Sequence, residues 1–497
     1  TYFEAGGSGA DASDLRHLVM TASTTTNAGD THAINAESTS GVLLLQTSNT
    51  DLIITNASTG ANLSTILGAS NVGDCEIRGT STIANATTLT IASGKTLTLG
   101  NSGAINNSGT LSNAGTLEFA ASNNGLTATA STTIGGTLTI SADTTLTCTS
   151  ALAITNNFNI GANTLTIAGT GNLTGGVITL NNASSILKRT GAGTIANALT
   201  FSTNGATLDI DAAVTCSGAF TMSANATFDI ANATTLLASN AGGIACGTTT
   251  LQFDGADGGT LNNIGGALTF STGTLDADVN IQIAGNITIS DDATFDIANG
   301  KTLDYTGQAI VVGSNNLTIT GTGGVGVFDN MSAINLDQTD SLLTLTQCEV
   351  TGVNQSGVAA TNKGISVATT AAEITSFTHS ASGRIALGAN LTITNGINLG
   401  ANTLTLSGAN QLSGGVITFN NGQSKIVQSG TGTIANNLIL ASFANPALDI
   451  DGTSTYSGTL SSNAAYQIDV ANNKVANTKY FAFLFFFVNS IIKIIYV

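Results

Sequence analysis

Acidic side chains are the residues of this chain whose type and spacing come nearest to a catalytic pattern. Six aspartates fall at positions that could stack on one face: Asp209, Asp211, Asp276, Asp278, Asp291 and Asp292. Carbohydrate-cleaving enzymes use paired carboxylates as acid, base or nucleophile, and those with a β-helical fold add Lys or Arg on the same face. The sequence lacks matching basic residues, so a polysaccharide-acting enzyme is the weakest of three functional interpretations.

The segment FDGADGG at Phe253–Gly259 is the best local candidate for binding calcium. Hard oxygen ligands from acidic side chains suit that ion. The segment does not have the ligand spacing of a calcium-binding loop. We therefore predict no metal ligand, no catalytic residue and no cofactor-binding residue in the chain.

Glycine-rich segments resemble two nucleotide-binding signatures at first sight. GTGGVG at Gly321–Gly326 has dinucleotide-motif spacing, but the following VFDNMS does not supply the helix that such a site needs. The GKT triplets that begin at Gly94 and Gly300 match the end of a phosphate-binding loop. Leu89 and Phe295 stand where its leading glycine is required. We predict that all three segments are corners between strands.

The histidines and cysteines show no catalytic or metal-binding spacing. His17 and His32 lie near the N-terminus and His379 lies far from both, so we expect solvated surface histidines. An odd number of cysteines cannot all pair within one chain, and no CxxC motif is present. We expect thiols that pack as small apolar residues in a stacked core: Cys75, Cys148, Cys216, Cys246 and Cys348.

The composition indicates an all-β protein that does not bind nucleic acid. Only 8% of the 497 residues are charged, against roughly 25% in ordinary soluble domains, yet 42% are hydrophobic. The 58 glycines and the many Thr, Asn and Ser residues suit strands and corners. A net charge of −17 without clusters of Lys or Arg excludes binding to nucleic acid or to an anionic membrane surface. This balance is typical of a secreted protein.

Short alternating runs separated by Gly and Asn predict a right-handed parallel β-helix. Thr96–Leu99, Thr164–Ile167 and Thr403–Leu406 alternate Thr with an apolar residue, which is the pattern of a strand. ATFDIAN occurs at Ala226 and again 67 positions later at Ala293, which corresponds to three coils. We expect roughly 20 coils of about 20–22 residues, with Leu, Ile, Val, Phe and Ala inside. Thr, Ser and Asn should face outward, and corner Asn residues should adopt the left-handed conformation.

The chain contains a large internal duplication. Residues 151–232 resemble residues 390–472, and Gly161 matches Gly400 at an offset of 239. Asp211 matches Asp451 at an offset of 240, so one residue is inserted between the two pairs. A repeat of this size indicates a repeat scaffold rather than an ordinary enzyme domain.

The two ends differ from the repeats at 21–475. Residues 1–20 form a cap or junction segment, with a lead-in suited to a short helix, or a linker from a preceding domain. Thr1 begins the sequence without a signal segment, so we expect a processed chain or a fragment. In the hydrophobic tail at 476–497, Tyr480–Val497 has three interpretations: a membrane anchor, strands that cap the last coil or join a neighbouring subunit, or a non-native extension.

The repeats resemble those of bacterial surface proteins. ANTLTLSGANQLSGG at Ala401–Gly415 and GTLTIS at Gly136–Ser141 are similar to passenger repeats of autotransporters and to filamentous-haemagglutinin-like β-helices. The resemblance covers most of residues 80–475. It implies a right-handed β-helix, secretion, and a role in adhesion or in a surface layer. The chain shows no alternating strands of a C-terminal translocator barrel.

These observations predict a non-catalytic extracellular protein that binds no cofactor. We expect a rigid β-solenoid subunit that joins copies of itself through its termini into a surface fibre. The alternative is a monomeric adhesin that binds glycans or surfaces. Membrane contact is expected only if residues 480–497 act as an anchor.

Overall fold

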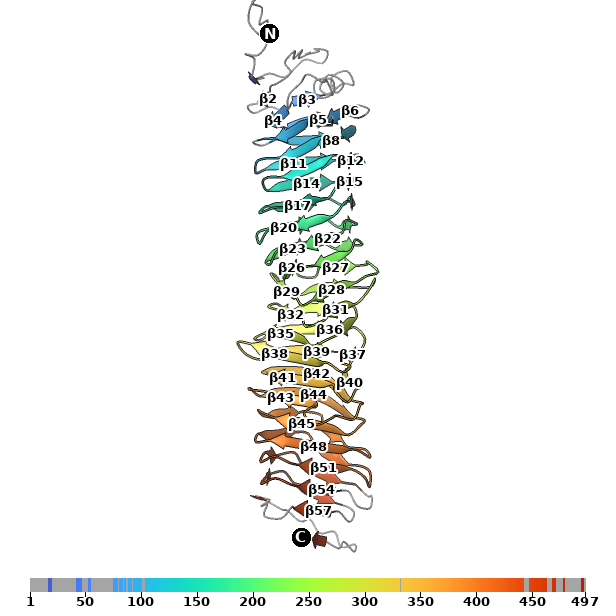
Figure 1. The fold of residues 1–497 in the computed structure, drawn as a ribbon, viewed down its shortest axis with the longest axis vertical. Helices are drawn as coiled ribbons and strands as arrows, with labels where there is room; N and C mark the ends of the chain where they lie inside the picture. The colour runs from blue at the N-terminus through green and yellow to red at the C-terminus, as the bar shows by residue number, and fades with distance from the viewer. Residues whose placement is uncertain are drawn as a thin grey trace, which may run out of the picture. The chain divides into compact units, whose positions relative to one another are not determined.

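The computed structural model is an all-β protein whose parallel strands stack as a β-solenoid (Figure 1). The structure describes residues 103–330, 332–441 and 447–462, parts of 75–100, and strands at 17–19, 42–46, 52–54, 467–470, 477–478 and 493–495. The described residues form about 17 turns and no helix. The predicted parallel β-helix is confirmed, with fewer turns than expected.

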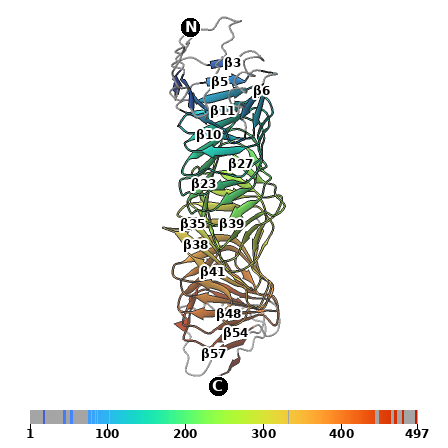
Figure 2. The same ribbon diagram turned by 45° about the horizontal axis from the view of Figure 1, so that its top comes forward.

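Two compact units, Thr1–Ala241 and Gly242–Val497, make up the chain. In each unit a regular turn has three short strands, which lie on three faces of the solenoid and follow one another in the chain. We call these face 1, face 2 and face 3. Each strand pairs in parallel with the strand on the same face of the next turn, as Figure 2 shows for β35, β38 and β41.

The strands of the first unit are as follows. Face 1 contains β1 (His17–Val19), β2 (Val42–Gln46), β4 (Cys75–Arg78), β7 (Thr96–Leu99), β10 (Thr116–Phe119), β13 (Thr137–Ile140), β16 (Phe158–Asn159), β19 (Ile178–Leu180), β22 (Leu199–Phe201) and β25 (Phe220–Met222). Face 2 contains β3 (Leu52–Ile54), β5 (Thr80–Ile83), β8 (Ala104–Asn107), β11 (Asn124–Ala128), β14 (Thr144–Cys148), β17 (Thr164–Ala168), β20 (Ile186–Arg189), β23 (Ala206–Ile210) and β26 (Ala226–Ile230). Face 3 contains β6 (Thr88–Ile91), β9 (Thr110–Asn113), β12 (Thr132–Ile134), β15 (Leu152–Ile154), β18 (Leu173–Gly175), β21 (Gly193–Ile195), β24 (Val214–Cys216) and β27 (Thr235–Ala238).

The second unit repeats this arrangement. Face 1 contains β28 (Ile244–Gly247), β31 (Leu268–Phe270), β34 (Ile287–Ile289), β37 (Ile310–Val311), β40 (Ile334–Leu336), β47 (Ile397–Asn398), β50 (Ile417–Phe419), β53 (Leu438–Leu440) and β56 (Leu460–Ser462). Face 2 contains β29 (Thr250–Asp254), β32 (Thr274–Ala277), β35 (Ala293–Ala298), β38 (Asn316–Thr322), β41 (Leu342–Thr346), β43 (Gly364–Val367), β45 (Gly383–Leu387), β48 (Thr403–Gly408), β51 (Lys425–Gln428), β54 (Ala447–Ile450), β57 (Gln467–Val470) and β59 (Lys493–Ile495). Face 3 contains β30 (Gly259–Asn262), β33 (Ile281–Ile283), β36 (Thr302–Tyr305), β39 (Gly326–Asn330), β42 (Cys348–Gln355), β44 (Ala372–His379), β46 (Leu391–Ile393), β49 (Gln411–Gly414), β52 (Thr433–Ile434), β55 (Thr455–Tyr456) and β58 (Asn477–Thr478). The long strands β42 and β44 continue onto face 1, where the second half of β42 pairs with β40 and with the second half of β44, so β37 and β40 belong to the same sheet as these strands.

Apolar side chains stack in register inside each unit. Phe295 pairs with Leu275 on one side and Ile319 on the other, and all three are fully buried. The ring of Phe295 also lies 5.7 Å from that of Phe270 and 5.6 Å from that of Phe328, measured between centroids. Each such side chain contributes about 1.5–3 kcal/mol by leaving water. The alternation of Thr with apolar residues in the sequence therefore corresponds to outward and inward positions.

The interior also contains polar side chains, which corrects the expectation of an all-apolar core. They occupy inward-facing positions at strand ends or in corners, where the chain leaves the ladder and backbone carbonyls need donors. Asn197 is fully buried, for example, and its Nδ2 donates to Gly176 O at 2.7 Å. The buried Asn, Gln, His and Arg side chains among the described residues are Asn107, Asn113, Asn124, Arg189, Asn197, Asn240, Asn263, Asn330, Gln355, His379, Gln428 and Asn436.

Corner Asn and Asp side chains connect successive turns. In each case a side-chain oxygen accepts a hydrogen bond from a backbone N–H of the following turn, at 2.7–3.1 Å, as in Asp143–Thr164, Asn157–Val177, Asn172–Thr194, Asp292–Asn316 and Asn437–Thr459. Among the described asparagines, only Asn123 and Asn362 have a positive φ. The expectation that corner asparagines are left-handed is therefore wrong for most of them, because their main role is to bond the next turn.

The duplicated segments make equivalent hydrogen bonds in the two units. Asn181 Oδ1 accepts from Gly161 N at 2.9 Å, and Asn420 Oδ1 accepts from Gly400 N at 2.7 Å. Asn436 Nδ2 donates to Gly415 O at 2.8 Å, as Asn197 does to Gly176 O. The sequence duplication is therefore also a duplication of local geometry.

Both ends contribute strands to the solenoid. Residues 17–19 form β1 and pair with β2, so the short helix considered for residues 1–20 does not include them. In the tail, β59 pairs in parallel with β57. Residues 1–16, and the tail residues other than 477–478 and 493–495, lie outside the described residues. Within the described part, no helix is long and apolar enough to cross a membrane.

The inter-turn bonds at the corners predict the effect of substitution at Asn157. Asn157→Ala removes the acceptor of Val177 N and should lower the free energy of unfolding by about 1 kcal/mol. Asn157→Asp keeps an acceptor, as Asp143 does at its own corner, and should cost only a few tenths of a kcal/mol, on the order of a surface substitution. Urea unfolding followed by circular dichroism measures both. Equal losses would show that the bond does not stabilise the corner.

Candidate functional site

The outward surface of the second unit carries polar columns on face 2. Strand pairing places equivalent residues of successive turns about 4.8 Å apart. One column consists of threonines: Thr250, Thr274, Thr294, Thr318 and Thr344. The neighbouring column is mixed: Gln252, Asp276, Asp296, Thr320 and Thr346. These columns offer many hydroxyl groups and a local concentration of carboxylates.

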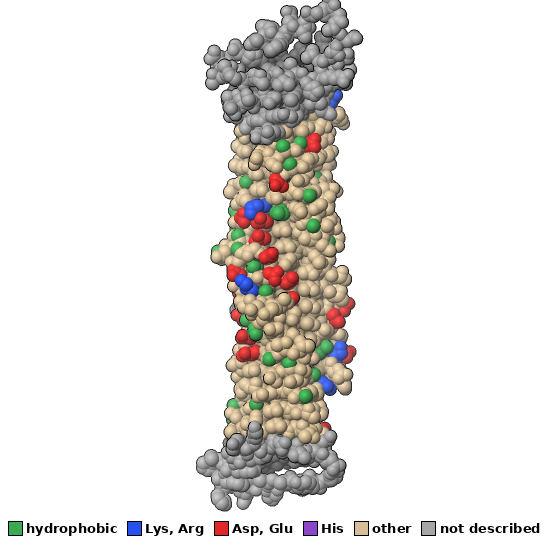
Figure 3. Space-filling view, turned by 90° about the vertical axis from the view of Figure 1, so that its left-hand side faces the viewer, with side chains coloured by type: hydrophobic (Ala, Val, Ile, Leu, Met, Phe, Trp, Pro, Cys, Tyr) green, Lys and Arg blue, Asp and Glu red, His purple; other side chains and the backbone are tan. Residues whose placement is uncertain are grey.

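Asp276 is the most perturbed carboxylate of this surface. It pairs in the ladder with Asp296 on the next turn, so two like charges face each other. Burial, followed by repulsion from Asp278, Asp296 and Asp254, raises its pKa to about 6. Gln252 Nε2 donates a hydrogen bond to Asp278 Oδ2 at 2.7 Å, which holds one of the neighbours in place. Figure 3 shows acidic side chains gathered on the described surface.

A lysine accompanies the aspartates of the first unit. Lys188 Nζ lies 2.6 Å from Asp209 Oδ2 and 2.7 Å from Asp211 Oδ2. Lys188 and Asp209 are ladder partners on adjacent turns, and Asp229 is the next residue of that column. The expectation that basic residues are missing beside these aspartates is therefore wrong for this pair, and both carboxylates are engaged in an ion pair.

The other predicted aspartates have structural roles at corners. Asp292 Oδ1 accepts from Asn316 N at 2.7 Å, and Asp291 Oδ1 accepts from Asp292 N at 2.8 Å. Neither carboxylate belongs to the column that contains Asp276. In the second unit the structure thus brings Asp276 and Asp278 together and leaves Asp291 and Asp292 apart from them.

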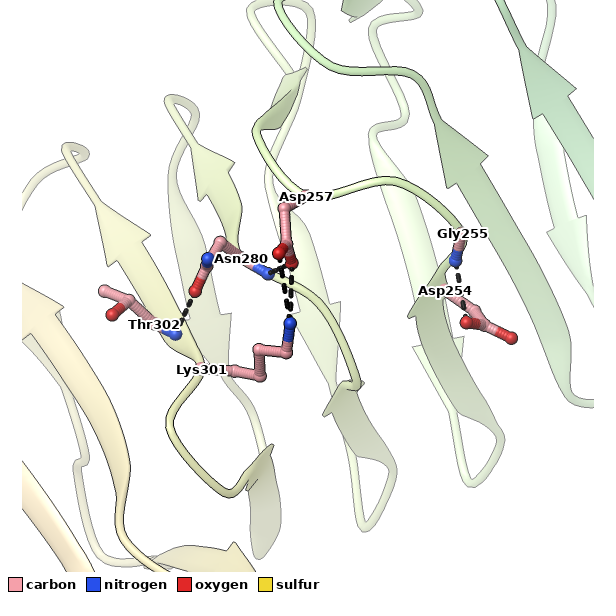
Figure 4. Close-up of polar contacts among 6 residues, drawn as sticks. All are labelled: Asp254, Gly255, Asp257, Asn280, Lys301 and Thr302. Carbon is pink, nitrogen blue, oxygen red and sulfur yellow. Dashed lines mark hydrogen bonds and ion pairs between the residues drawn. The ribbon is translucent and has the colours of Figure 1, made fainter.

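The carboxylates considered for calcium lie at the end of β29, which is Asp254, and in the loop that follows it, which contains Asp257. Asp257 accepts a hydrogen bond from Asn280 N at 2.8 Å, and both its oxygens lie 3.0 Å from Lys301 Nζ (Figure 4). Asp254 points elsewhere and accepts a 2.7 Å hydrogen bond from Gly255 N. The two carboxylates do not converge, and an ammonium group already contacts Asp257. Among the described residues, no group of three or more His, Cys, Asp or Glu is placed to hold a metal ion.

The glycine-rich segments are corners, as predicted. Gly94 and Gly300 of the two GKT triplets have φ of +75° and +69°, a region that favours glycine. In Gly321–Gly326 the corner is residues 323–325, because Gly321 and Thr322 end β38 and Gly326 begins β39, a strand rather than a helix. These segments therefore lack the helix N-terminus that binds phosphate in nucleotide sites.

His379 is buried, which corrects the expectation of a solvated surface histidine. Its side chain lies in the interior next to the ring of Phe377, at 5.8 Å between centroids, and is 5% exposed. Burial lowers its pKa to about 4, although Nδ1 lies 3.4 Å from Leu399 O. Nε2 has no hydrogen-bond partner. The side chains of His17 and His32 lie outside the described residues.

The cysteines behave as predicted wherever their side chains are described. Cys148, Cys216, Cys246 and Cys348 are buried and free of disulfide bonds. Burial raises the pKa of the Cys148 thiol to about 11 and that of the other three to about 12. Neutral thiols of this kind are poor nucleophiles. The side chain of Cys75 lies outside the described residues.

Sequence analysis missed Arg189, which is fully buried at the end of β20. Its Nε and Nη2 atoms donate hydrogen bonds to backbone carbonyl groups, and Nη1 has no hydrogen-bond partner. Burial lowers its pKa. Its place two residues after Leu187 in an alternating run is the signal that could have assigned it to the interior.

Comparison with models of known protein families and with curated protein sequences gives no match to this chain. The fold places the chain among β-solenoid repeat proteins.

Because His379 is buried, we expect the free energy of unfolding to fall in acid. Its pKa is lowered from an ordinary value near 6.5 to about 4, so its contribution is present above pH 6.5 and is lost as pH falls towards 4. The full loss is about 3 kcal/mol. His379→Gln, which matches its ladder partner Gln355, should remove this dependence. Hydrogen exchange of residues 372–399 between pH 7 and pH 4 measures it, after correction for intrinsic exchange. If hydrogen exchange had the same pH dependence in the unmodified chain and in His379→Gln, His379 would not be the cause of the acid sensitivity.

For Asp276 we expect the opposite pH dependence of the free energy of unfolding. Because its pKa is raised from 3.8 to about 6, the stability gained from its protonated form is present below pH 3.8 and lost as pH rises through 6. Asp276→Asn should therefore raise the free energy of unfolding at pH 7 by on the order of 1 kcal/mol, after allowance for solvent screening, with no gain at pH 4. Urea unfolding at both pH values tests this. The exposed Asp340→Asn is the charge-matched control, and an equal gain there would rule out the local cause.

Proposed function

We propose that this chain is a non-catalytic extracellular structural protein that assembles with copies of itself into a surface fibre. The observation that carries the proposal is the in-register parallel ladder, which continues from turn to turn on face 2 within each unit. A ladder of this kind can accept a further strand at its edge without any new side-chain site.

The packing of the turns supports a mechanical role. Inward columns of Leu, Ile and Phe are fully buried, and corner side chains bond one turn to the next. Parallel solenoid repeats derive their stability from such contacts between neighbours. The outward columns carry mostly short side chains, and the prominent acidic groups are paired or stacked. A stiff spacer needs these properties and does not need a cleft.

Strand edges at the ends support assembly. Among the described strands, β1 pairs with β2 alone and β59 pairs with β57 alone. Each of these strands has a second edge with backbone groups that can pair with another chain. Residues 1–20 and 480–497 are therefore the junctions that we propose between subunits.

Extracellular location and a bacterial surface role form part of the same proposal. The repeats resemble autotransporter passengers and filamentous-haemagglutinin-like proteins, and scarce charge with many Thr, Ser and Asn residues is compatible with that setting. The four described thiols are buried and so are protected from oxidants outside a cell.

A monomeric adhesin is the second candidate. The column from Thr250 to Thr344 beside Gln252 and Asp276 presents hydroxyl, amide and carboxylate groups that can bond a glycan. This function would use the side of the solenoid, whereas fibre formation would use its ends. The two proposals therefore predict different responses to changes in the terminal strands.

Negative-stain electron microscopy of the native protein without denaturant tests the proposal. We expect regular filaments whose length grows with protein concentration. Ile494→Pro removes a backbone N–H from β59 and should shorten them, whereas Lys493→Ala keeps that backbone and is the control. Single particles at every concentration would overturn the fibre proposal. Binding to a glycan array by those particles would favour the adhesin.

A further inference from the structure

The buried Arg189 shows that a corner of the solenoid can hold a positive charge beside carbonyl groups, although its Nη1 has no hydrogen-bond partner. Its Nε donates to Gly191 O at 2.6 Å. Its Nη2 donates to Gly171 O at 2.7 Å, and to Gly169 O and Ala192 O at 3.1 Å each. The side chain is fully buried. We call these four oxygens, from two successive turns, the carbonyl cage of the first unit.

The internal duplication places Gln428 at the position equivalent to Arg189. Arg189 lies in the ladder between Ile167 and Ile210, and Gln428 lies between Leu406 and Ile450. The same offset of 239 residues gives the equivalent carbonyl groups, which belong to Gly408, Asn410, Gly430 and Thr431. A neutral side chain therefore occupies the ladder position that a cationic side chain occupies in the other copy.

Gln428 does not satisfy its own polar atoms. The side chain is 1% exposed, and neither Nε2 nor Oε1 has a hydrogen-bond partner. Gln355, at the end of β42, shows the bond that glutamine can make at such a corner, because its Nε2 donates to Gly357 O at 2.5 Å. A buried amide oxygen without any partner is costly, so Gln428 Oε1 calls for a further ligand, whereas Nε2 needs an acceptor.

The backbone around Gln428 resembles that of the first cage in part: Asn410 O accepts a hydrogen bond from Thr433 N at 3.1 Å, whereas its equivalent Gly171 O accepts from Arg189 Nη2. Gly408 has φ of +97° and its equivalent Gly169 has +79°. A Cβ atom added to Gly193 would overlap Arg189 Nη2 and lie 2.9 Å from Gly171 O. One added to Gly432, the equivalent of Gly193, would overlap Asn410 O and lie 3.3 Å from Gly408 O. Two carbonyl oxygens thus converge near the point that a guanidinium nitrogen occupies in the first unit.

We propose that this second cage is a binding site for a desolvated monovalent cation of the K⁺ class. Its ligands are the carbonyl oxygens of Gly408, Asn410, Gly430 and Thr431, together with Gln428 Oε1. All are neutral oxygens, which bind K⁺ in proteins when they replace its hydration shell. One positive charge matches the guanidinium of the first cage.

The charges near the second cage support a monovalent ion over a divalent one. Asp449 lies one position before Ile450, faces outward and pairs with Lys425 Nζ at 2.6 Å. Calcium sites in proteins ordinarily include carboxylates, and Mg²⁺ keeps bound waters in a strict octahedron. A buried cage of neutral carbonyl groups meets neither requirement.

Hydrogen exchange of the complete chain in KCl, NaCl or choline chloride at equal ionic strength tests the site. At a K⁺ concentration ten times the dissociation constant, amides of residues 403–434 should exchange about tenfold more slowly than in choline chloride. Residues 186–194, which surround Arg189, are the internal control and should not respond. Equal exchange of residues 403–434 in all three salts would overturn the proposal, because a bound water would give that result.

Two exchanges between the copies sharpen the test. Cys216 is the ladder partner of Ile195 in the first unit, and Tyr456 is the partner of the equivalent Ile434 in the second. Gln428→Arg together with Tyr456→Cys therefore gives the second cage the residues of the first. This double variant should abolish the K⁺ effect at residues 403–434. Arg189→Gln should create a K⁺ effect at residues 186–194. A K⁺ effect that persists with arginine in the second cage would place the ion elsewhere and overturn the assignment. The salt comparison with the unmodified chain decides the question even where a variant does not fold.

Discussion

The pairing of every backbone N–H and C=O group is the constraint on which this structure depends. On the three faces the parallel ladder satisfies it automatically, since each turn pairs with the next. At the corners the ladder is interrupted and side chains must take over. Corner Asn and Asp oxygens accept the N–H groups, as in Asn157–Val177, and inward amide groups donate to the carbonyl groups, as in Asn197–Gly176. The abundance of asparagine is therefore a consequence of the backbone.

The parallel ladder also determines which side chains of successive turns lie next to each other, and so it determines both their packing and their electrostatic interactions. Residues at one position of successive turns are brought next to each other, which is favourable for the apolar Phe295 between Leu275 and Ile319. It is unfavourable for Asp276 beside Asp296: burial raises the pKa of Asp276, and repulsion from Asp278 and Asp296 raises it further. Repetition therefore has a limit on the outward faces, where like charges accumulate. The Lys188–Asp209 pair shows how one substitution within a column relieves it.

The alternation of Thr with apolar residues was sufficient to predict the strands, their inward faces and the solenoid. Glycine spacing was sufficient to identify the corners at Gly94 and Gly300. The partners across turns could not be predicted, because ladder partners lie 20 residues apart at Leu275–Phe295 and 26 apart at Ile319–Leu345. Arg189 and His379 follow the inward alternation, two residues after Leu187 and Phe377, but general preferences for polar residues place them outside. At a strand end the local need for donors overrides those preferences.

Strand ends are consequently the positions where this scaffold can acquire specific chemistry. Inward positions within strands are restricted by packing to apolar residues, and outward positions are exposed to water, which weakens polar interactions. A strand end is buried and lies beside carbonyl groups that have left the ladder, and in this chain such positions hold Arg189, Gln355, His379 and Gln428. The two copies of the duplication differ at such a position while keeping their corner hydrogen bonds. A repeat protein can therefore vary its buried charge from turn to turn without changing its fold.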